Sequence, residues 1–198
     1  MTGFLRSAVF LDRDGVLNEV VVRDGKPFPP QSPDDVVVIA GMAEACARMR
    51  RQGFVLVVVT NQPDVARGRQ SAAGVAAINS VLSHAVEVDA VYVCPHDNDD
   101  GCGCRKPKPG MLHAAAADLS LDLGHSFMVG DRWSDISAGQ GAGCRTVYID
   151  NGYQERQPQA PDHVVGSPVE ALEWIRMTVR QEEGGNVGST SLRHQDLR

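Results

Sequence analysis

The sequence predicts an α/β fold built on a Rossmann-like, doubly wound sheet whose strands are mostly parallel. Two observations support this prediction. Short apolar segments alternate with longer segments of helical pattern along the chain, which is typical of a sheet covered by helices. In addition, residues 54–60, FVLVVVT, are apolar almost throughout, as expected of a parallel strand that is buried on both faces.

The first half of the chain supplies three expected strands and two expected helices. A short buried strand at residues 8–12 leads into residues 15–35, whose prolines, glycines and aspartates predict a long loop. A helix follows at residues 41–53, with Gly53 as its C-cap. The next elements are the strand at 54–60, a helix at 71–86 and a strand at 88–95.

The second half continues the alternation. We expect a helix at 110–120, a strand at 126–131, a short helix at 134–143, a strand at 145–150 and an edge strand at 162–166. Ser167 as N-cap and Pro168 at the first helical position begin a last helix that ends at residue 180. Residues 181–198 are polar and rich in glycine and serine, which predicts a flexible tail.

Composition limits the classes of function. The chain has 198 residues and a formal net charge of −6, which predicts one domain, residues 1–180, without a nucleic-acid groove or a polybasic membrane surface. The sequence has neither a membrane-spanning apolar run nor a signal peptide, so we expect a cytoplasmic protein. We also expect a monomer, since no apolar stripe is evident, and no disulfide framework in this reducing compartment.

Polar residues follow the predicted strands, where parallel sheets bind ligands. Carboxylates end the first strand, at Asp12 and Asp14, and the fourth, at Asp131 and Asp135; Thr60, Asn61 and Gln62 end the second strand. Carboxylates gathered at one edge repel each other unless a cation lies between them, and Mg²⁺ prefers such oxygen ligands. Any one of these aspartates can instead be a helix cap or turn residue, but capping does not require acids at i and i+2.

Three cysteines and a histidine form a second candidate metal site. Cys94, His96, Cys102 and Cys104 lie within eleven residues, and three thiolates with one imidazole match a structural, tetrahedral Zn²⁺ site. The alternative is a set of free cysteines beside a surface histidine. With four protein ligands the site has no position for a catalytic water, so zinc is expected to fold the loop that carries Arg105 and Lys106.

Four segments resemble the motifs of the haloacid dehalogenase superfamily of phosphatases. These are DRDGVL at 12–17, TNQ at 60–62, RKPKPGM at 105–111 and VGDRWSD at 129–135. They occur in the superfamily's order, and the resemblance covers residues 8–150. The cysteine and histidine insertion is similar to that of the zinc-containing branch, which includes heptose 1,7-bisphosphate phosphatases and histidinol-phosphate phosphatases. No large cap domain fits between Gly15 and Gly41 or between Thr60 and Cys94.

The resemblance implies roles for these residues. Asp12 is the expected nucleophile, which forms an aspartyl-phosphate, and Asp14 the expected general acid and base. Thr60 and Lys106 are expected to bind the transferring phosphoryl group. Asp131 is expected to hold Mg²⁺ together with Asp12 and the backbone carbonyl of Asp14. Asp135 supports this shell, either near the metal or by orienting Lys106.

The substrate is expected to be a small phosphorylated sugar. Asn61, Gln62 and Arg105 are the expected substrate-binding residues, with Asn18, Arg67 and Arg69 as further candidates. The motifs favour a heptose 1,7-bisphosphate cleaved at its terminal, non-anomeric phosphate. The five residues between His96 and Cys102 resemble the histidinol-phosphate phosphatases instead. A phosphotransferase would need a cap that excludes water, and a non-catalytic zinc-stabilised binding module is a further alternative.

Overall fold

Six parallel strands form the central sheet of this protein. The computed structural model describes residues 5–186. The strands are β1 (Ala8–Leu11), β4 (Val55–Asn61), β5 (Ala90–Cys94), β6 (Phe127–Gly130), β7 (Arg145–Ile149) and β8 (His163–Val165). Their order across the sheet is β5-β4-β1-β6-β7-β8, and every neighbouring pair is parallel. The predicted fold class is confirmed, and β8 is the edge strand expected at 162–166.

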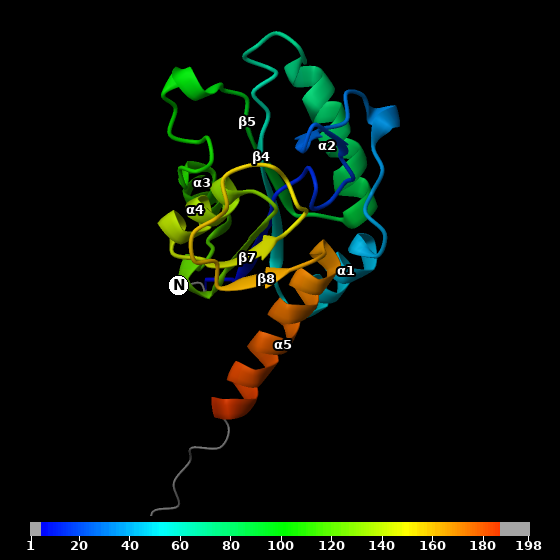
Figure 1. The fold of residues 1–198 in the computed structure, drawn as a ribbon. Helices are drawn as coiled ribbons and strands as arrows, with labels where there is room; N and C mark the ends of the chain where they lie inside the picture. Colours follow the sequence, from blue (N-terminus) through cyan, green and yellow to red (C-terminus); the bar gives the residue numbers. More distant parts are fainter. Residues whose placement is uncertain (1–4, 187–198) are drawn as a thin grey trace, which may run out of the picture.

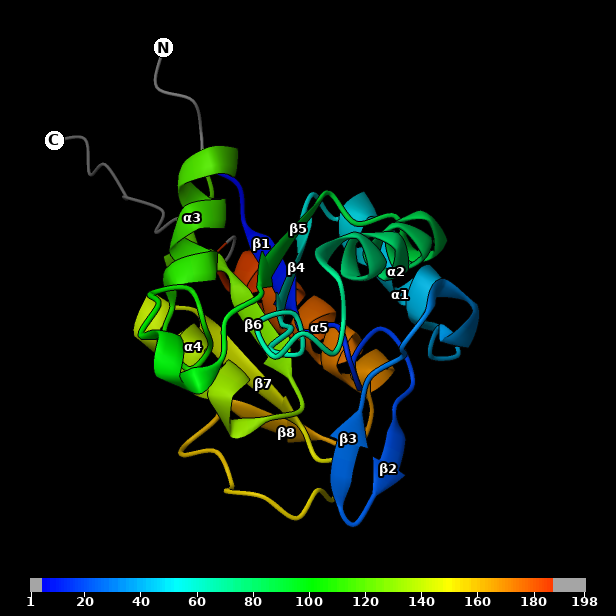
Figure 2. The same cartoon turned by 90° about the horizontal axis from the view of Figure 1, so that it is seen from above.

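Helices cover both faces of the sheet (Figures 1 and 2). Helices α1 (Met42–Arg51), α2 (Ala72–Val86) and α5 (Pro168–Asn186) lie on one face, and α3 (Gly110–Leu119) and α4 (Trp133–Ala142) on the other. Single 3₁₀ turns occur at Pro33–Asp35, Asn98–Asp100 and Leu123–His125. Helix α5 continues to Asn186, so the first residues of the predicted tail are helical. The rest of that tail, residues 187–198, lies outside the described residues.

The prediction of a long loop at residues 15–35 is wrong in part. Strands β2 (Val21–Arg23) and β3 (Lys26–Phe28) form an antiparallel hairpin in this segment. Asp24 and Gly25 connect them, with φ of 48° and 68°. Positive φ at both central residues is what a tight hairpin turn requires, and Asp-Gly is a preferred pair for it. The prolines and the short strands hid this signal.

Strand β1 is the centre of the fold. All four of its residues are fully buried. Val9 and Leu11 pack into the apolar cluster beneath α1, α2 and α5, whereas Ala8 and Phe10 pack into the cluster beneath α3 and α4. Alternate residues of a strand point to opposite faces, so β1 is anchored in both layers, and the residue that follows it is held at a fixed place on the sheet edge.

Phe127 links the sheet to the last helix, and its removal tests this packing. Its ring is fully buried and meets the rings of Phe54 and Trp174 edge-on, with centroids 6.1 and 6.2 Å away. We expect Phe127→Ala to lower the free energy of unfolding by about 3–5 kcal/mol, because it leaves a cavity. Urea denaturation measures this loss. The control Val164→Ala, at an exposed position of β8, should change it by less than about 0.5 kcal/mol.

Candidate active site

The functional residues meet at the carboxyl edge of the three central strands. Asp12 follows β1, and its amide donates to the carbonyl of Val129 on β6 at 3.0 Å. Thr60 is the second-last residue of β4 on one side, and Asp131 follows β6 on the other. A cavity of about 580 Å³ opens at this edge. Its lining includes Asp12, Asp14, Thr60, Asn61, Gln62, Arg105, Lys106 and Asp135, which are most of the residues predicted from the sequence.

Three carboxylates and one ammonium group form the floor of the site. Asp12, Asp131 and Asp135 are buried, and one oxygen of each lies within 4.8 Å of the others. The Lys106 Nζ lies 2.8 Å from Asp12 Oδ1 and 2.6 Å from Asp135 Oδ1. It also donates to the Val59 carbonyl at 2.7 Å. The ammonium is therefore paired with two carboxylates, and one of them, Asp135, contacts it directly.

The floor carries more negative than positive charge. Burial raises the pKa of Asp12 to about 6; Lys106 opposes this shift, and Asp135 adds to it. Burial and the neighbouring carboxylates raise the pKa of Asp131 well above its usual value. Asp131 Oδ1 is also buried without a hydrogen-bond partner among residues 5–186. An orphaned oxygen beside two more carboxylates fits a hard divalent cation such as Mg²⁺.

Two residues that the sequence analysis missed hold Asp131. The amide of Asn151 donates to Asp131 Oδ2 at 3.1 Å and to the carbonyl of Gly15 at 3.3 Å. The hydroxyl of Tyr153 also bonds to Asp131. Both residues belong to the segment directly after β7. That position, at the carboxyl end of a parallel strand, is the signal that could have found them.

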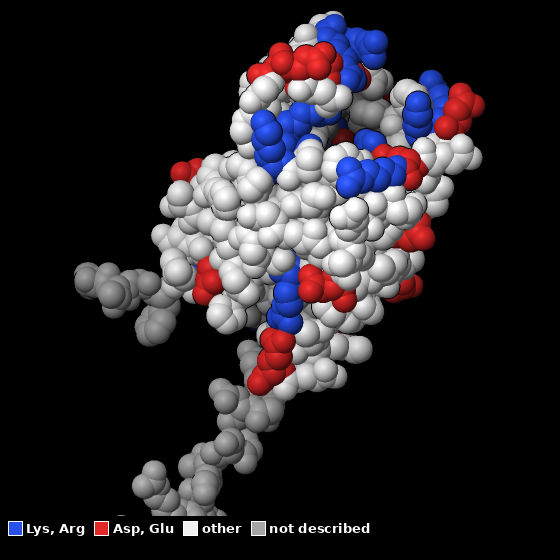
Figure 3. Space-filling model, turned by 60° about the vertical axis from the view of Figure 1, so that its left-hand side comes forward, with Lys and Arg blue, Asp and Glu red and all other residues white. Residues whose placement is uncertain are grey.

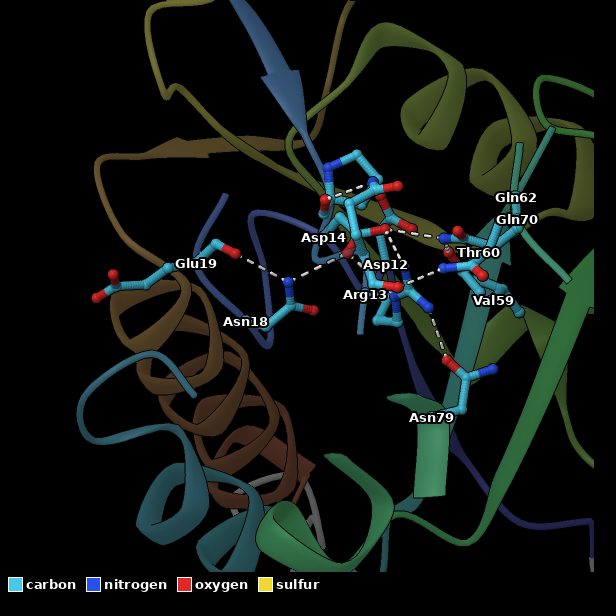
Figure 4. A network of polar contacts seen from close by, with 12 residues as sticks. Asp12, Arg13, Asp14, Asn18, Glu19, Val59, Thr60, Gln62, Gln70 and Asn79 are labelled. Atoms are coloured by element: carbon cyan, nitrogen blue, oxygen red, sulfur yellow. Dashed lines mark hydrogen bonds and ion pairs between the residues drawn. The ribbon is translucent and has the colours of Figure 1, made fainter. Parts of the chain in front are cut away.

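Asp14 is not part of this floor, because its carboxylate turns to other donors (Figure 4). Oδ1 accepts from Arg13 Nε at 3.0 Å and from Asn18 at 3.1 Å. Oδ2 accepts from Arg13 Nη2 and from Gln62, both at 2.8 Å. Asn18 was expected to contact substrate, but it is fully buried. That expectation is wrong, because the side chain is used inside the fold to hold Asp14.

The residues predicted to bind substrate contact the protein itself in this structure. Asn61 donates to the Lys106 carbonyl at 3.0 Å and accepts from the Lys106 amide at 3.1 Å, so it fixes the backbone of that residue. The amide of Gln62 donates to Thr60 Oγ1 at 2.9 Å as well as to Asp14. Arg105 donates to Asn98 at 2.9 Å and to the carbonyl of His96 at 3.2 Å.

The cysteine and histidine residues converge beside the site. One ligand atom from each of Cys94, His96, Cys102 and Cys104 lies within 4.8 Å of the others. Cys94 Sγ is 3.4 Å from Cys104 Sγ and 3.7 Å from Cys102 Sγ, and the His96 ring nitrogen lies 3.3 Å from Cys104 Sγ. Three thiolates and one imidazole at such separations can bind one metal ion. The cluster is only two residues from Lys106 along the chain.

Basic side chains surround the opening of the cavity. Figure 3 shows lysine and arginine side chains around a hollow at the upper end of the molecule. Arg67, Arg69, Arg105 and Arg132 line the cavity. Arg67 is paired with Asp97 and Asp64, and Arg132 with Glu155. Arg105 has no carboxylate partner among the described residues, because its two bonds go to neutral groups.

None of the helices within residues 5–186 has the length and apolar character needed to cross a membrane.

Comparisons with known proteins agree on one family. Residues 103–171 match the HAD-hydrolase-like family model. The chain is 38% identical over 149 residues to a D-glycero-beta-D-manno-heptose-1,7-bisphosphate 7-phosphatase of Bordetella bronchiseptica, covering 73% of this chain and 80% of the relative. It is 39% identical over 158 residues to the Vibrio cholerae protein of the same name, covering 73% and 81%. A crystal structure of the B. bronchiseptica D,D-heptose 1,7-bisphosphate phosphatase with magnesium and phosphate superposes with a TM-score of 0.75 at 32% identity, covering 87% of this chain and 99% of that one.

Gly15 offers a test of the carboxylate floor. Its φ is +82°, and a Cβ there would lie 1.9 Å from Asp131 Oδ2. We expect Gly15→Ala to displace Asp131 and weaken Mg²⁺ binding by at least about tenfold, as measured by calorimetry. Gly53→Ala is the matched control, since Gly53 has a φ of +88° and open space around it. It should cost about 1–2 kcal/mol of stability through the same backbone strain and leave Mg²⁺ binding unchanged.

Proposed function

Because the chain belongs to the family of D-glycero-D-manno-heptose-1,7-bisphosphate 7-phosphatases, within the haloacid dehalogenase superfamily, we propose that it removes the 7-phosphate of a heptose 1,7-bisphosphate. It is a phosphoric monoester hydrolase. The observation that carries the proposal is the buried contact of Lys106 with both Asp12 and Asp135, next to Asp131. Neither a histidinol-phosphate substrate nor a non-catalytic binding role is favoured by these relatives.

The first chemical step transfers the phosphoryl group to Asp12. A carboxylate oxygen of Asp12 attacks phosphorus, and the bond from phosphorus to the sugar oxygen breaks. Asp14 gives a proton to the departing sugar oxygen, so the sugar leaves as a neutral alcohol. Lys106 and the Thr60 hydroxyl stabilise the charge on the phosphoryl oxygens. The support is that all four side chains line one cavity.

The second step restores the enzyme. A water molecule attacks the phosphorus of the aspartyl-phosphate, Asp14 takes one of its protons, and the bond from phosphorus to the Asp12 oxygen breaks. Inorganic phosphate then leaves. Over the two steps one water is consumed, and Asp14 returns to its protonated form. Asp135 holds Lys106 throughout, because it contacts the ammonium at 2.6 Å.

The cation in this proposal is Mg²⁺, which Asp12, Asp131 and the backbone carbonyl of Asp14 would hold, with Asp135 alongside. When bound, Mg²⁺ supplies positive charge that neutralises the carboxylates and the phosphoryl oxygens. Asn151 and Tyr153 bond to Asp131 and would keep its carboxylate oriented toward the ion. The B. bronchiseptica phosphatase was solved with magnesium and phosphate, which supports the same cofactor here.

The charge at the rim favours a bisphosphate. The second phosphate of such a substrate needs a cation at some distance from Lys106, and Arg105 is available because its partners are neutral. Histidinol phosphate carries an amine at its other end, which Arg105 would repel. Asn61 and Gln62 then act on the substrate indirectly. Their side-chain amides hold Lys106, Asp14 and Thr60, which contact the substrate in this proposal.

A substrate panel with Mg²⁺ tests this assignment. We expect kcat/KM for heptose 1,7-bisphosphate to exceed that for histidinol phosphate, with release of the 7-phosphate identified by phosphorus NMR. Asp12→Asn removes the nucleophile and should lower kcat by about 10³-fold or more on every ester. Faster turnover of histidinol phosphate would refute the substrate, and full activity in Asp12→Asn would refute the covalent mechanism.

The second metal in this proposal is a structural Zn²⁺ bound by Cys94, His96, Cys102 and Cys104. Tetrahedral bonds of about 2.3 Å from zinc to sulfur place two thiolates about 3.8 Å apart. The sulfur separations of 3.4 and 3.7 Å support that geometry. Lys108 ties the same loop together by donating to the Cys102 carbonyl at 2.6 Å. With four protein ligands the ion would shape the loop and take no part in the chemistry.

Cysteine substitutions test the zinc proposal. We expect about one zinc per purified chain, and its loss in Cys104→Ser, measured by atomic emission. Activity should fall with it, because the loop carries Lys106. The control Cys144→Ala removes a buried thiol outside the cluster and should keep the zinc. A wild-type chain without zinc, or a Cys104→Ser chain that keeps it, would count against this site.

The proposal also includes the cellular setting. A cluster of reduced thiols suits a reducing compartment, and the cytoplasm is the expected one. We propose that the protein acts there as a monomer on a small molecule, without nucleic-acid or membrane partners.

A further inference from the structure

We propose that Arg13 is a positioning residue for the reaction, which fixes the carboxyl group of Asp14 for proton transfer. The inference rests on the proposed phosphatase function. Arg13 lies between the nucleophile and the acid in sequence, yet the mechanism above gives it no role. It is only 1% exposed. Burying a guanidinium group is costly unless its donors are paired, so its contacts are informative.

The guanidinium holds Asp14 by two parallel bonds. Nε donates to Oδ1 at 3.0 Å and Nη2 to Oδ2 at 2.8 Å. A two-point contact between planar groups fixes the plane of the carboxylate as well as its distance. A lysine would make a single contact and leave the carboxylate free to rotate. Arg13 therefore controls the orientation of Asp14, and its contribution goes beyond charge.

The guanidinium is itself held from the other side. Nη1 donates to Asn79 Oδ1 at 2.9 Å, and Asn79 is a buried residue of helix α2. Figure 4 shows Arg13 between Asn79 and Asp14. The contact joins residues 66 positions apart in the chain. Through Asn79, helix α2 thus holds the Arg13 guanidinium group in place beside Asp14.

The other donors to Asp14 indicate where the substrate enters. Asn18 bonds to Oδ1 at 3.1 Å and Gln62 to Oδ2 at 2.8 Å. With Arg13 they supply four hydrogen bonds, which is the full capacity of a carboxylate. Of these three donors only Gln62 lines the cavity. The leaving sugar oxygen, and later the water, can replace Gln62 at Oδ2 while Arg13 and Asn18 keep the carboxyl group in place.

A comparison of two leaving groups separates positioning from a purely structural role. An alkyl phosphate needs a proton on its leaving oxygen, whereas 4-nitrophenyl phosphate leaves as a stable anion without one. The parameter kcat/KM reports the step that forms the aspartyl-phosphate, so later hydrolysis does not obscure it. General acid catalysis contributes about 10²–10⁴-fold. We expect Arg13→Met to lower kcat/KM for the best alkyl substrate of the panel at least about tenfold more than for the aryl ester.

Further variants keep the test decisive. Arg13→Lys retains the charge without the two-point contact and should show the same selective loss, reduced in size. Asn79→Leu removes the acceptor that holds the Arg13 guanidinium group and lies outside the cavity. It should also lower kcat/KM more for the alkyl ester than for the aryl ester, and it provides the test if Arg13→Met does not fold. Mg²⁺ binding by calorimetry should stay unchanged in each. Arg48→Met, in a partly exposed arginine of α1 with carboxylate partners, is the control and should alter neither ester.

The outcomes distinguish this inference from the proposed function. Equal losses on both esters, with folding and Mg²⁺ binding intact, would overturn the positioning role and leave the phosphatase assignment standing. A wild-type protein that hydrolyses neither ester would overturn the phosphatase assignment and this inference with it. A selective loss on the alkyl ester in Arg13→Met or Asn79→Leu supports the inference.

Discussion

The interaction on which the rest of the site depends is the buried pairing of the Lys106 ammonium with Asp12 and Asp135. Burial alone would lower the pKa of Lys106, but the two carboxylates raise it overall. The lysine thereby remains charged in a place where an isolated ammonium would be costly. It also brings together three separate elements, since Asp12 follows β1, Asp135 lies on α4 and Lys106 follows the cysteine cluster.

Separate sets of residues hold Lys106, Asp131 and Asp14 in place around this pairing. Asn61 fixes the backbone of Lys106 with two bonds, and Asn151 and Tyr153 hold Asp131. Arg13 and Asn18 hold Asp14 apart from the carboxylate floor. The two aspartates at i and i+2 therefore lie in different surroundings, one against an ammonium in the floor and one in a set of four nitrogen donors. Such a difference suits two carboxylates that are given different roles.

The sequence predicted the sheet and its helices, because apolar runs are local signals. It also placed Asp12, Asp14, Asp131, Asp135 and Lys106 at one edge, and the structure brings all of these side chains together except that of Asp14, which turns to other donors. Other contacts depend on tertiary structure and could not be read in this way. The bond from Arg13 to Asn79 joins the segment after β1 to a distant helix, and the contact of Asn151 with Asp131 depends on the order of β6 and β7. The short hairpin was hidden by its prolines, although its Asp-Gly turn was visible in the sequence.

Strand β1 has a mechanical consequence for the active site. It is bonded on one side to β4, which carries Thr60, and on the other to β6, which leads to Asp131. Asp12 and its two neighbours are therefore carried by three adjacent, hydrogen-bonded strands in the middle of the sheet, away from the edge strands β5 and β8. A displacement of one of these groups relative to the others would have to break hydrogen bonds between the strands.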